Sequence, residues 1–186
     1  MKLEVHSLAL PDVKLIRSPR FGDRRGYFAE TYMRRDFVAA GLATEFVQDN
    51  QSGSAARGTV RGLHFQVPPF AQAKLVRILR GSILDVVVDL RRSSPSYGRH
   101  LSVELDADGD EQLFIPTGFA HGYCTLEPET VVFYKVDKVY SAEHERGVNW
   151  ADPKLGIQWP VVESLAVLSE KDRVLPPLRD LPVFFE

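Results

Sequence analysis

The sequence predicts an all-β protein, built as a β-barrel or a two-sheet sandwich with a few short helices. Two observations indicate this class. The middle of the chain is a succession of short apolar runs separated by turn-forming residues at regular spacing, which is typical of barrels and sandwiches. The 186 residues also contain no internal repeat, low-complexity tract or linker, so we expect a single domain over residues 1–186.

The individual elements follow from the same alternation of apolar runs and turns. Residues 34–42 predict one short helix that ends on Gly41 or just beyond it. Residues 74–80 and 83–90 are predicted strands, joined by the two-residue connection Gly81–Ser82 that is typical of hairpins. The further expected elements are a loop over 91–100, strands over 101–105, 111–116, 122–126 and 130–140, and a turn over 106–110.

Two segments indicate how the sheets are arranged and covered. Alternation along residues 83–90 puts Asp85 and Asp89 on one face, together with Ile83 and Val87, and the remaining apolar side chains on the other. At the end of the chain, residues 168–186 are too rich in proline for regular structure, and we expect them to wrap around the sheets.

The composition excludes several classes of protein. Apolar residues make up 44% and charged residues 26% of the chain, as in ordinary globular proteins, and the net charge of −2 disfavours a nucleic-acid binder. No apolar run is long enough for a membrane span, so we expect no membrane contact and a cytoplasmic location. Cys124 is the single cysteine, which excludes an intrachain disulfide; we expect it to pack as a small apolar residue.

Five histidines are candidates for chemistry, and two of them have notable neighbours. The five are His6, His64, His100, His121 and His144. Most histidines in proteins are structural or simply exposed. His64 differs because it lies in "RGLHFQ", three residues after Arg61, and His121 because it lies in the glycine-rich "IPTGFAHGY". We therefore expect the site near these two.

The pattern Pro116-x-Gly118-x-x-His121 resembles the second motif of cupin barrels. In metal-dependent cupins the first motif supplies His-x-His and, shortly after it, a glutamate. Here the matching stretch is His64-Phe65-Gln66, and no glutamate follows before Lys74. Because half of the usual ligand set is missing and a lysine stands near the vacancy, we expect no metal site. A metal-dependent cupin oxygenase remains an alternative.

Eight segments, in order, resemble the dTDP-4-dehydrorhamnose 3,5-epimerases, cupin-fold enzymes of dTDP-L-rhamnose synthesis. They extend from about residue 12 to about residue 178. The segments are "FGDRRGYFAET", "FVQDNQS", "GTVRGLHFQ", "AQAKLV", "DVVVDLRRSSPSYG", "IPTGFAHGY", "FYKVDKVYSAEHERGVNWADP" and "LSEKD". The resemblance implies a cupin-type jelly roll and a cofactor-free isomerase that inverts C3 and C5 of a dTDP-linked 4-keto-6-deoxysugar.

The family's catalytic residues match four positions of this chain. By resemblance, His64 is the base, Asp172 orients it, Lys74 stabilises charge on the C4 oxygen, and Tyr134 is the proton donor. These residue types suit the chemistry, because an imidazole accepts a proton near neutral pH and a phenol remains protonated there. Without the resemblance, Asp172 and Lys74 would be interpreted as surface charges and Tyr134 as a core aromatic residue.

The resemblance also implies which residues bind the substrate. The matching positions are Arg25, Glu30, Gln48, Asn50, Arg61, His121, Tyr140, Glu145 and Lys171. Arginine suits diphosphate oxygens, and side-chain amides suit the imide edge of a pyrimidine. Tyr140 would lie beside the nucleotide or the sugar, and Gly62 is expected to let the backbone approach the ligand.

Family members are typically homodimers in which an N-terminal segment reaches the neighbouring subunit's site. Here that segment would be residues 23–30, so Arg25 and Glu30 would act in trans. Two alternatives to the double epimerase remain open beside the oxygenase: an enzyme that inverts C3 or C5 alone in another dTDP-deoxysugar, and a non-catalytic cupin that binds a nucleotide sugar.

Overall fold

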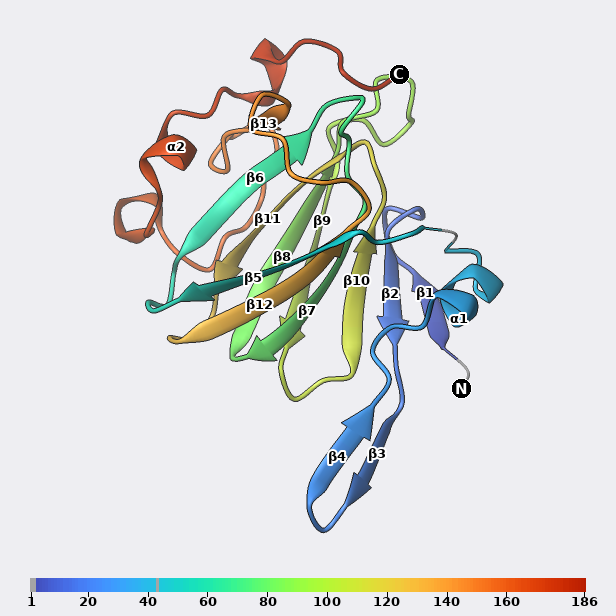
Figure 1. The fold of residues 1–186 in the computed structure, drawn as a ribbon. Helices are drawn as coiled ribbons and strands as arrows, with labels where there is room; N and C mark the ends of the chain where they lie inside the picture. Colours follow the sequence, from blue (N-terminus) through green and yellow to red (C-terminus); the bar gives the residue numbers. More distant parts are fainter. Residues whose placement is uncertain (1–2, 43) are drawn as a thin grey trace.

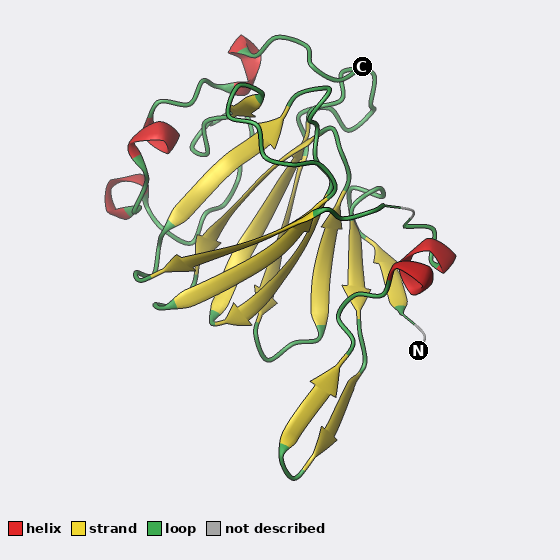
Figure 2. Cartoon of the chain, viewed as in Figure 1, coloured by secondary structure: helices red, strands yellow, loops and turns green. Residues whose placement is uncertain are grey.

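The structure is a sandwich of two antiparallel β-sheets with a two-stranded arm that projects from it (Figure 1). It is a computed structural model and describes residues 3–42 and 44–186. Strands dominate and helices are few and short, so the expected all-β jelly roll is confirmed (Figure 2). The sheets do not close into a barrel, so the sandwich is the correct one of the two predicted architectures.

The larger sheet has six strands. Their order across the sheet is β1 (Glu4–Ser7), β2 (Lys14–Arg17), β10 (Glu111–Ile115), β7 (Lys74–Arg80), β12 (Thr130–Val136) and β5 (Gln48–Ser54). The strand β5 therefore forms one edge, next to β12. Its partly buried residues alternate with exposed ones from Gln48 to Ser52, so one face of this edge strand is turned towards the interior.

The second sheet has five strands, in the order β13 (Glu145–Gly147), β6 (Val60–Gln66), β11 (Phe119–Thr125), β8 (Ser82–Asp89) and β9 (His100–Asp106). The arm pairs β3 (Arg20–Asp23) with β4 (Gly26–Ala29). The helices are α1 (Arg34–Ala39), α2 (Glu170–Arg173) and the short 3-10 turns Glu163–Leu165 and Leu178–Asp180.

Both faces of the five-stranded sheet are covered by apolar side chains. On the inner face, Ile83 and Val87 of β8 pack with residues of the six-stranded sheet such as Val76. The outer face contributes Phe65, which lies under Phe184 and Phe185 of the C-terminal segment, with ring centroids 5.7 and 6.0 Å apart. The alternation predicted along residues 83–90 is therefore confirmed, and the C-terminal segment covers the sheet as expected.

Several predicted boundaries differ from the observed ones. The strand β7 has the expected bounds, and β8 begins one residue early, at Ser82. The helix α1 ends at Ala39 rather than at residue 42, because Gly41 adopts a positive φ of 82° that stops it. The strand β12 ends at Val136, so residues 137–140 leave the sheet four residues earlier than predicted.

The C-terminal prediction is wrong in one respect, because residues 168–186 contain two short helical turns. The first is α2, where the side chain of Ser169 accepts a hydrogen bond from the Asp172 backbone N–H. Such a side-chain cap supports a helical turn even where proline is frequent in the surrounding sequence. The second is the 3-10 turn Leu178–Asp180.

The arm formed by β3 and β4 extends away from the sandwich (Figure 1). It carries exposed aromatic residues. Phe21, Tyr27 and Phe28 are 56%, 62% and 65% exposed. Aromatic side chains are usually at least half buried in folded proteins. The arm therefore presents an apolar surface to its surroundings.

Two expectations from composition concern membranes and Cys124. None of the helices within residues 3–42 and 44–186 has the length and hydropathy needed to cross a membrane. Cys124 is fully buried among Val60, Trp150 and Ala166, which confirms its expected role as a small apolar side chain. Burial raises the pKa of its thiol to about 11, so it remains protonated.

Candidate active site

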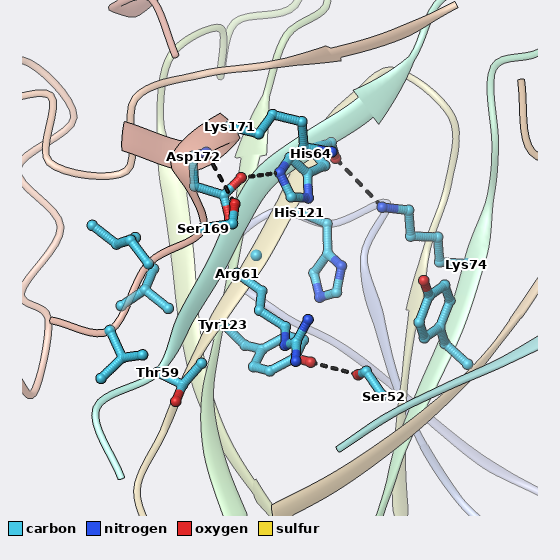
Figure 3. A pocket seen from close by; sticks show the side chains of 15 residues that line it. Ser52, Thr59, Arg61, His64, Lys74, His121, Tyr123, Ser169, Lys171 and Asp172 are labelled. Carbon is cyan, nitrogen blue, oxygen red and sulfur yellow. Dashed lines mark hydrogen bonds and ion pairs between the residues drawn. The ribbon is translucent and has the colours of Figure 1, made fainter. Parts of the chain in front are cut away.

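A cavity of about 570 Å³ opens between the two sheets (Figure 3). We call it the main pocket. Most of the predicted site residues line it: Arg61, His64, Lys74, His121, Tyr134, Lys171 and Asp172. A second space of about 250 Å³, the side pocket, shares His64, Lys74 and Tyr134 with the main pocket. Four more predicted residues line the side pocket: Gln48, Asn50, Tyr140 and Glu145.

A bulge in β6 puts Arg61 and His64 on the same face. In the pairing of β6 with β11, His121 lies opposite His64 and Tyr123 lies opposite Arg61. Three steps along β6 thus match two steps along β11. Because strand side chains alternate, a regular strand would point Arg61 and His64 to opposite faces. The extra residue lets both side chains line the main pocket.

Gly62 makes this bulge possible. Its φ is +122°, and a Cβ there would lie 2.7 Å from Cα of Gly122 and 2.8 Å from the carbonyl oxygen of His121. A Cβ on Gly122 would in turn lie 2.6 Å from the carbonyl oxygen of Arg61. The close neighbour of Gly62 is therefore the backbone of β11. The expected approach of this backbone to a ligand stays a prediction.

The imidazole of His64 is held by a carboxylate that comes from α2. Nε2 of His64 lies 2.5 Å from Oδ1 of Asp172, as Figure 3 shows. Asp172 is 3% exposed, and its backbone N–H donates to Oγ of Ser169 at 3.1 Å. In "LSEKD" the serine is the N-cap and Asp172 lies three residues later, at the position where an acidic residue usually completes a capping box. Here the carboxylate faces His64 instead.

The ionisation of Asp172 fixes the tautomer of His64. Burial opposes ionisation, but hydrogen bonds from His64 and Ser169 outweigh it and lower the pKa of Asp172 below its ordinary value. An ionised carboxylate accepts hydrogen bonds only, so Nε2–H of His64 is the donor. The lone pair of His64 is then on Nδ1. A carboxylate-oriented imidazole of this kind is a general base.

Lys74 and Tyr134 lie on neighbouring strands, β7 and β12, and line both pockets together with His64. Nζ of Lys74 donates to the carbonyl oxygen of His64 at 3.4 Å. Burial lowers the pKa of Lys74 to about 8, although the charges of Asp85 and Glu145 oppose this shift. Burial raises the pKa of Tyr134, so its phenol keeps its proton at neutral pH.

A second histidine–carboxylate pair lies deeper in the site. Nε2 of His121 is 2.9 Å from Oδ2 of Asp85, and both side chains are buried. Burial lowers the pKa of His121 in spite of this carboxylate, and the charges of Lys74 and His64 lower it further, so the imidazole is neutral. It donates from Nε2 to Asp85, and its Nδ1 accepts no hydrogen bond from the described residues. It can therefore accept a hydrogen bond from a hydroxyl group in the pocket.

Asp85 was not among the predicted site residues. Alternation along the strand predicted that it shares a face with Ile83 and Val87, and in the structure this is the inner face, where a buried carboxylate needs a partner. Oδ1 of Asp85 is buried and has no hydrogen-bond partner within the described part of the chain. A charged residue within the apolar run "ILDVVVDL" was the available signal.

Arg61 is held in place by β5. Its Nε donates to Oγ of Ser54 at 3.2 Å, and its Nη2 donates to the carbonyl oxygen of Gly53 at 2.9 Å. These two bonds leave further guanidinium donors for an anion in the main pocket, which Arg61 lines. The sequence alone did not assign a role to Ser54.

Glu145 joins the two pockets through hydrogen bonds. It accepts from Nζ of Lys171 at 2.7 Å and from the hydroxyl of Tyr140 at 2.9 Å. Lys171 precedes Asp172 in α2 and lines the main pocket, whereas Tyr140 lines the side pocket. Both ends of this network are exposed, so a ligand can displace either bond.

Two predicted residues do not lie in the pockets of their own chain. Arg25 follows β3 at the tip of the arm, where its Nη2 pairs with Oδ2 of Asp23 at 2.6 Å. Glu30 follows β4 and lines neither the main pocket nor the side pocket. A single copy of the chain therefore does not bring these two side chains to the site.

Possible metal ligands are scarce in this arrangement. Within the described residues, no group of three or more His, Cys, Asp or Glu side chains is placed to hold a metal ion. His64 and His121 each use Nε2 to bond a carboxylate.

The chain matches one family model over residues 7–180, described as dTDP-4-dehydrorhamnose 3,5-epimerase. The chain belongs to the dTDP-4-dehydrorhamnose 3,5-epimerase family. It is therefore an isomerase of the epimerase class. A relative of that name from Sinorhizobium fredii is 53% identical to it, over 97% of this chain and 92% of the relative.

Solved structures agree with this family in fold as well as in sequence. A dTDP-4-dehydrorhamnose 3,5-epimerase from Bacillus anthracis with TDP and PPi bound is 48% identical, with a TM-score of 0.91, over 94% of this chain and 99% of that one. A dTDP-6-deoxy-D-glucose-3,5-epimerase from Legionella pneumophila in complex with dTDP-4-keto-L-rhamnose is 36% identical, also with a TM-score of 0.91, over 97% and 95%. A 3'-monoepimerase from Streptomyces bikiniensis is 31% identical, with a TM-score of 0.87, over 94% and 87%.

The bulge makes a prediction about stability. Gly62→Ala places a Cβ against the backbone of β11 at a positive φ, so we expect the free energy of unfolding to fall by about 2 kcal/mol or more. Urea denaturation followed by circular dichroism measures this change. Gly53→Ala is the matched control, because nothing lies within 4 Å of a Cβ at Gly53 and its φ is not positive. Equal stability of the two variants would contradict this account of β6.

Proposed function

We propose that the protein converts dTDP-4-dehydro-6-deoxy-D-glucose to dTDP-4-dehydro-L-rhamnose by inverting C3 and C5, a step of dTDP-L-rhamnose biosynthesis. One observation carries the proposal: a carboxylate-held imidazole, a buried ammonium and a protonated phenol line the same cavity. The relative from Sinorhizobium fredii and the structure from Bacillus anthracis are both named as dTDP-4-dehydrorhamnose 3,5-epimerases, which supports the same conclusion.

The reaction requires three chemical groups. Both C3 and C5 are bonded to the C4 ketone carbon, so removal of either proton gives an enolate. A base must take the proton, a cation must stabilise the negative oxygen, and an acid must return a proton to the opposite face. Stabilisation of an oxyanion by a fixed donor is typically worth about a hundredfold to a thousandfold in rate.

The base and its orienting group are assigned to the pair that joins β6 to α2. Nδ1 of His64 takes the proton from C3 or C5, and Asp172 then stabilises the imidazolium through Nε2–H. Because Asp172 stays ionised, the positive charge formed on His64 has a partner already in place. The proton leaves to solvent before the next cycle.

Lys74 and Tyr134 are assigned to the cation and the acid. Among the described residues, Nζ of Lys74 bonds the His64 carbonyl oxygen alone, and at a long distance of 3.4 Å, so it is available to a ketone oxygen. The hydroxyl of Tyr134 donates a proton to the enolate carbon on the face opposite His64. The phenolate formed on Tyr134 is then reprotonated from water. These steps conserve atoms and charge without a cofactor.

The remaining residues are assigned to substrate binding. Arg61 and Lys171 supply positive charge for the diphosphate, and neutral His121 accepts a hydrogen bond from a sugar hydroxyl. In the side pocket, Gln48 and Asn50 offer amides to the imide edge of thymine. Tyr140 and Glu145 line the same space.

Inversion at both carbons is favoured over inversion at one. The relatives named as 3,5-epimerases reach 53% identity, whereas the 3'-monoepimerase structure is 31% identical. All of them share the fold, so the fold itself does not distinguish these activities. Measuring isotope exchange separately at C3 and at C5 distinguishes them.

The direct test is to incubate the protein with dTDP-4-dehydro-6-deoxy-D-glucose in D₂O and follow C3 and C5 by NMR. We expect deuterium at both carbons, and at least a hundredfold slower exchange, an order-of-magnitude figure, in the base variant His64→Asn. Exchange at one carbon would identify a monoepimerase. Binding of the nucleotide sugar without any exchange would identify the non-catalytic alternative.

The pH dependence follows from Lys74. Because its pKa is about 8 and the ammonium is the active form, kcat/KM should fall as pH rises through about 8. The phenol of Tyr134 loses its proton only at much higher pH, since burial raises its pKa. In Lys74→Arg, the guanidinium stays charged and this decline should be absent. An unchanged alkaline decline in that variant would exclude Lys74 as its cause.

We also propose that the active form is a homodimer in which the arm completes the partner's site. The arm leaves Phe21, Tyr27 and Phe28 exposed, and Arg25 and Glu30 lie outside the pockets of their own chain. A second copy of the chain would bury these aromatic side chains and receive the charge of Arg25 beside its own Arg61.

Hybrid dimers test this arrangement. Chains with His64→Asn and chains with Arg25→Ala should each give low activity. A hybrid of the two has one site with both defects and one intact site, so mixed subunits should recover activity towards half of the wild-type value per hybrid dimer. If the mixture is no more active than the sum of its parents, Arg25 does not act in trans.

The cytoplasm is the compartment that we propose. The free thiol of Cys124 is compatible with a reducing environment, although its burial also protects it. The proposed partners are the sugar nucleotide and a second copy of the chain. Nucleic acid and membranes are not among them.

A further inference from the structure

Residues 137–141 form an irregular segment that carries Tyr140 to the side pocket. The segment follows β12 of the six-stranded sheet and leads towards β13 of the five-stranded sheet, so it crosses from one sheet to the other (Figure 1). It has no strand partner of its own. Its backbone polar groups must therefore be satisfied by other means.

Hydrogen bonds that involve side chains hold every residue of this segment. Oδ1 of Asp137 accepts from the Ala73 backbone N–H at 2.7 Å. Three glutamine side chains supply the other bonds. Gln72 donates to the Lys138 carbonyl at 2.7 Å, and Gln48 accepts from the Tyr140 N–H at 3.0 Å. Gln66 donates to the Val139 carbonyl at 3.2 Å and accepts from the Ser141 N–H at 2.7 Å.

Gln66 is the centre of this arrangement. Its side chain is 3% exposed, and its amide uses both kinds of group: Oε1 accepts from Ser141, and Nε2 donates to Val139 and to the carbonyl oxygen of Phe70 at 2.7 Å. Val139 and Ser141 are the two neighbours of Tyr140 in the chain. One buried amide thus fixes the backbone on either side of Tyr140.

The aromatic ring of Tyr140 is nevertheless open to a ligand. Its side chain is about half exposed, and beyond its hydroxyl bond to Glu145 the ring faces the side pocket beside Gln48 and Asn50. The backbone that carries the ring is therefore held by hydrogen bonds, while part of the ring surface remains exposed to a ligand. This is the form of a preorganised stacking surface, because no loop needs to be ordered when a flat ligand binds.

We propose that Gln66 is a positioning residue for nucleotide binding: by clamping Val139 and Ser141 it holds Tyr140 in the orientation that receives the base of the dTDP moiety. The inference rests on the proposed function in one respect, that the side pocket takes the base of a nucleotide sugar. Gln66 lines the side pocket together with Tyr140, but its amide atoms are occupied by backbone groups, so we assign its effect to Tyr140 rather than to a hydrogen bond with the ligand.

The first test measures binding of two probes to Gln66→Met, which keeps the length of the side chain and removes its hydrogen bonds. We expect the affinity for dTDP to fall by about twofold to twelvefold, the cost of ordering one or more mobile side chains. Affinity for inorganic pyrophosphate should be unaffected, because Arg61 and Lys171 lie in the main pocket. In turnover, KM should rise by a larger factor than kcat falls.

The second test is a double-mutant cycle with Tyr140→Ala. If Gln66 acts through Tyr140, the Gln66→Met substitution should cause no further loss of dTDP affinity once the ring is absent. Additive losses would show that Gln66 contributes independently of Tyr140 and would overturn the proposal. Undiminished dTDP affinity in a folded Gln66→Met protein would overturn it as well.

Two further variants keep the test decisive. Gln72→Leu removes the more exposed bond to the Lys138 carbonyl, and it should give a smaller loss in the same direction even if Gln66→Met does not fold. Gln158→Met is the matched control, because its amide also bonds a backbone carbonyl, of Gly156, but outside both pockets. Equal effects of the Gln72 and Gln158 substitutions on dTDP binding would contradict the proposal.

Failure of the proposed function would be distinguishable from failure of this inference. If the wild-type protein binds dTDP but does not exchange deuterium into a 4-keto sugar, the catalytic assignment fails and the binding comparison still stands. If exchange occurs and Gln66→Met binds dTDP as the wild type does, the clamp alone is excluded.

Discussion

The hydrogen bond between His64 and Asp172 is the interaction on which the site depends. It joins β6 of the five-stranded sheet to a four-residue helix more than a hundred positions later in the chain. A local feature of the backbone positions each partner. The bulge at Gly62 turns His64 inward next to Arg61. The Ser169 cap holds Asp172 in the first turn of α2. Without either feature the imidazole would lack its orienting charge.

The interior around this bond holds an unusual set of charges for an apolar sandwich. Asp85 is fully buried and Lys74 is nearly so. Neutral His121 bonds Asp85 and lines the main pocket beside Lys74. Burial of a charged group is costly unless a partner compensates it. Here Asp85 supports the charge on Lys74 and fixes the tautomer of His121. Its Oδ1 has no hydrogen-bond partner among the described residues, so compensation of its buried charge is incomplete. Incomplete compensation inside a cavity is typical of sites built for charged intermediates.

The sequence predicted the regular strands, and which residues gather in the pockets, better than it predicted the contacts between residues that are distant in the chain. The strand at residues 74–80 was predictable because alternation and a two-residue turn act locally. The bulge was not, because it depends on the contact of Gly62 with Gly122, which are 60 positions apart. The same limit applies to Asp85 and to the glutamines around Tyr140, whose partners come from other strands and loops. Arg25 and Glu30 illustrate a further limit, because they line neither the main pocket nor the side pocket of their own chain and the sequence of one chain does not show how two copies pack.

The central claim, that an ionised Asp172 fixes which nitrogen of His64 can act as base, is open to direct measurement. Nitrogen-15 NMR of histidine-labelled protein, with His64 assigned by comparison with His64→Asn, distinguishes the two tautomers at neutral pH. The account predicts a protonated Nε2 coupled to Asp172 and an unprotonated Nδ1, with this preference lost in Asp172→Asn. A proton found on Nδ1 of the wild-type protein would contradict it.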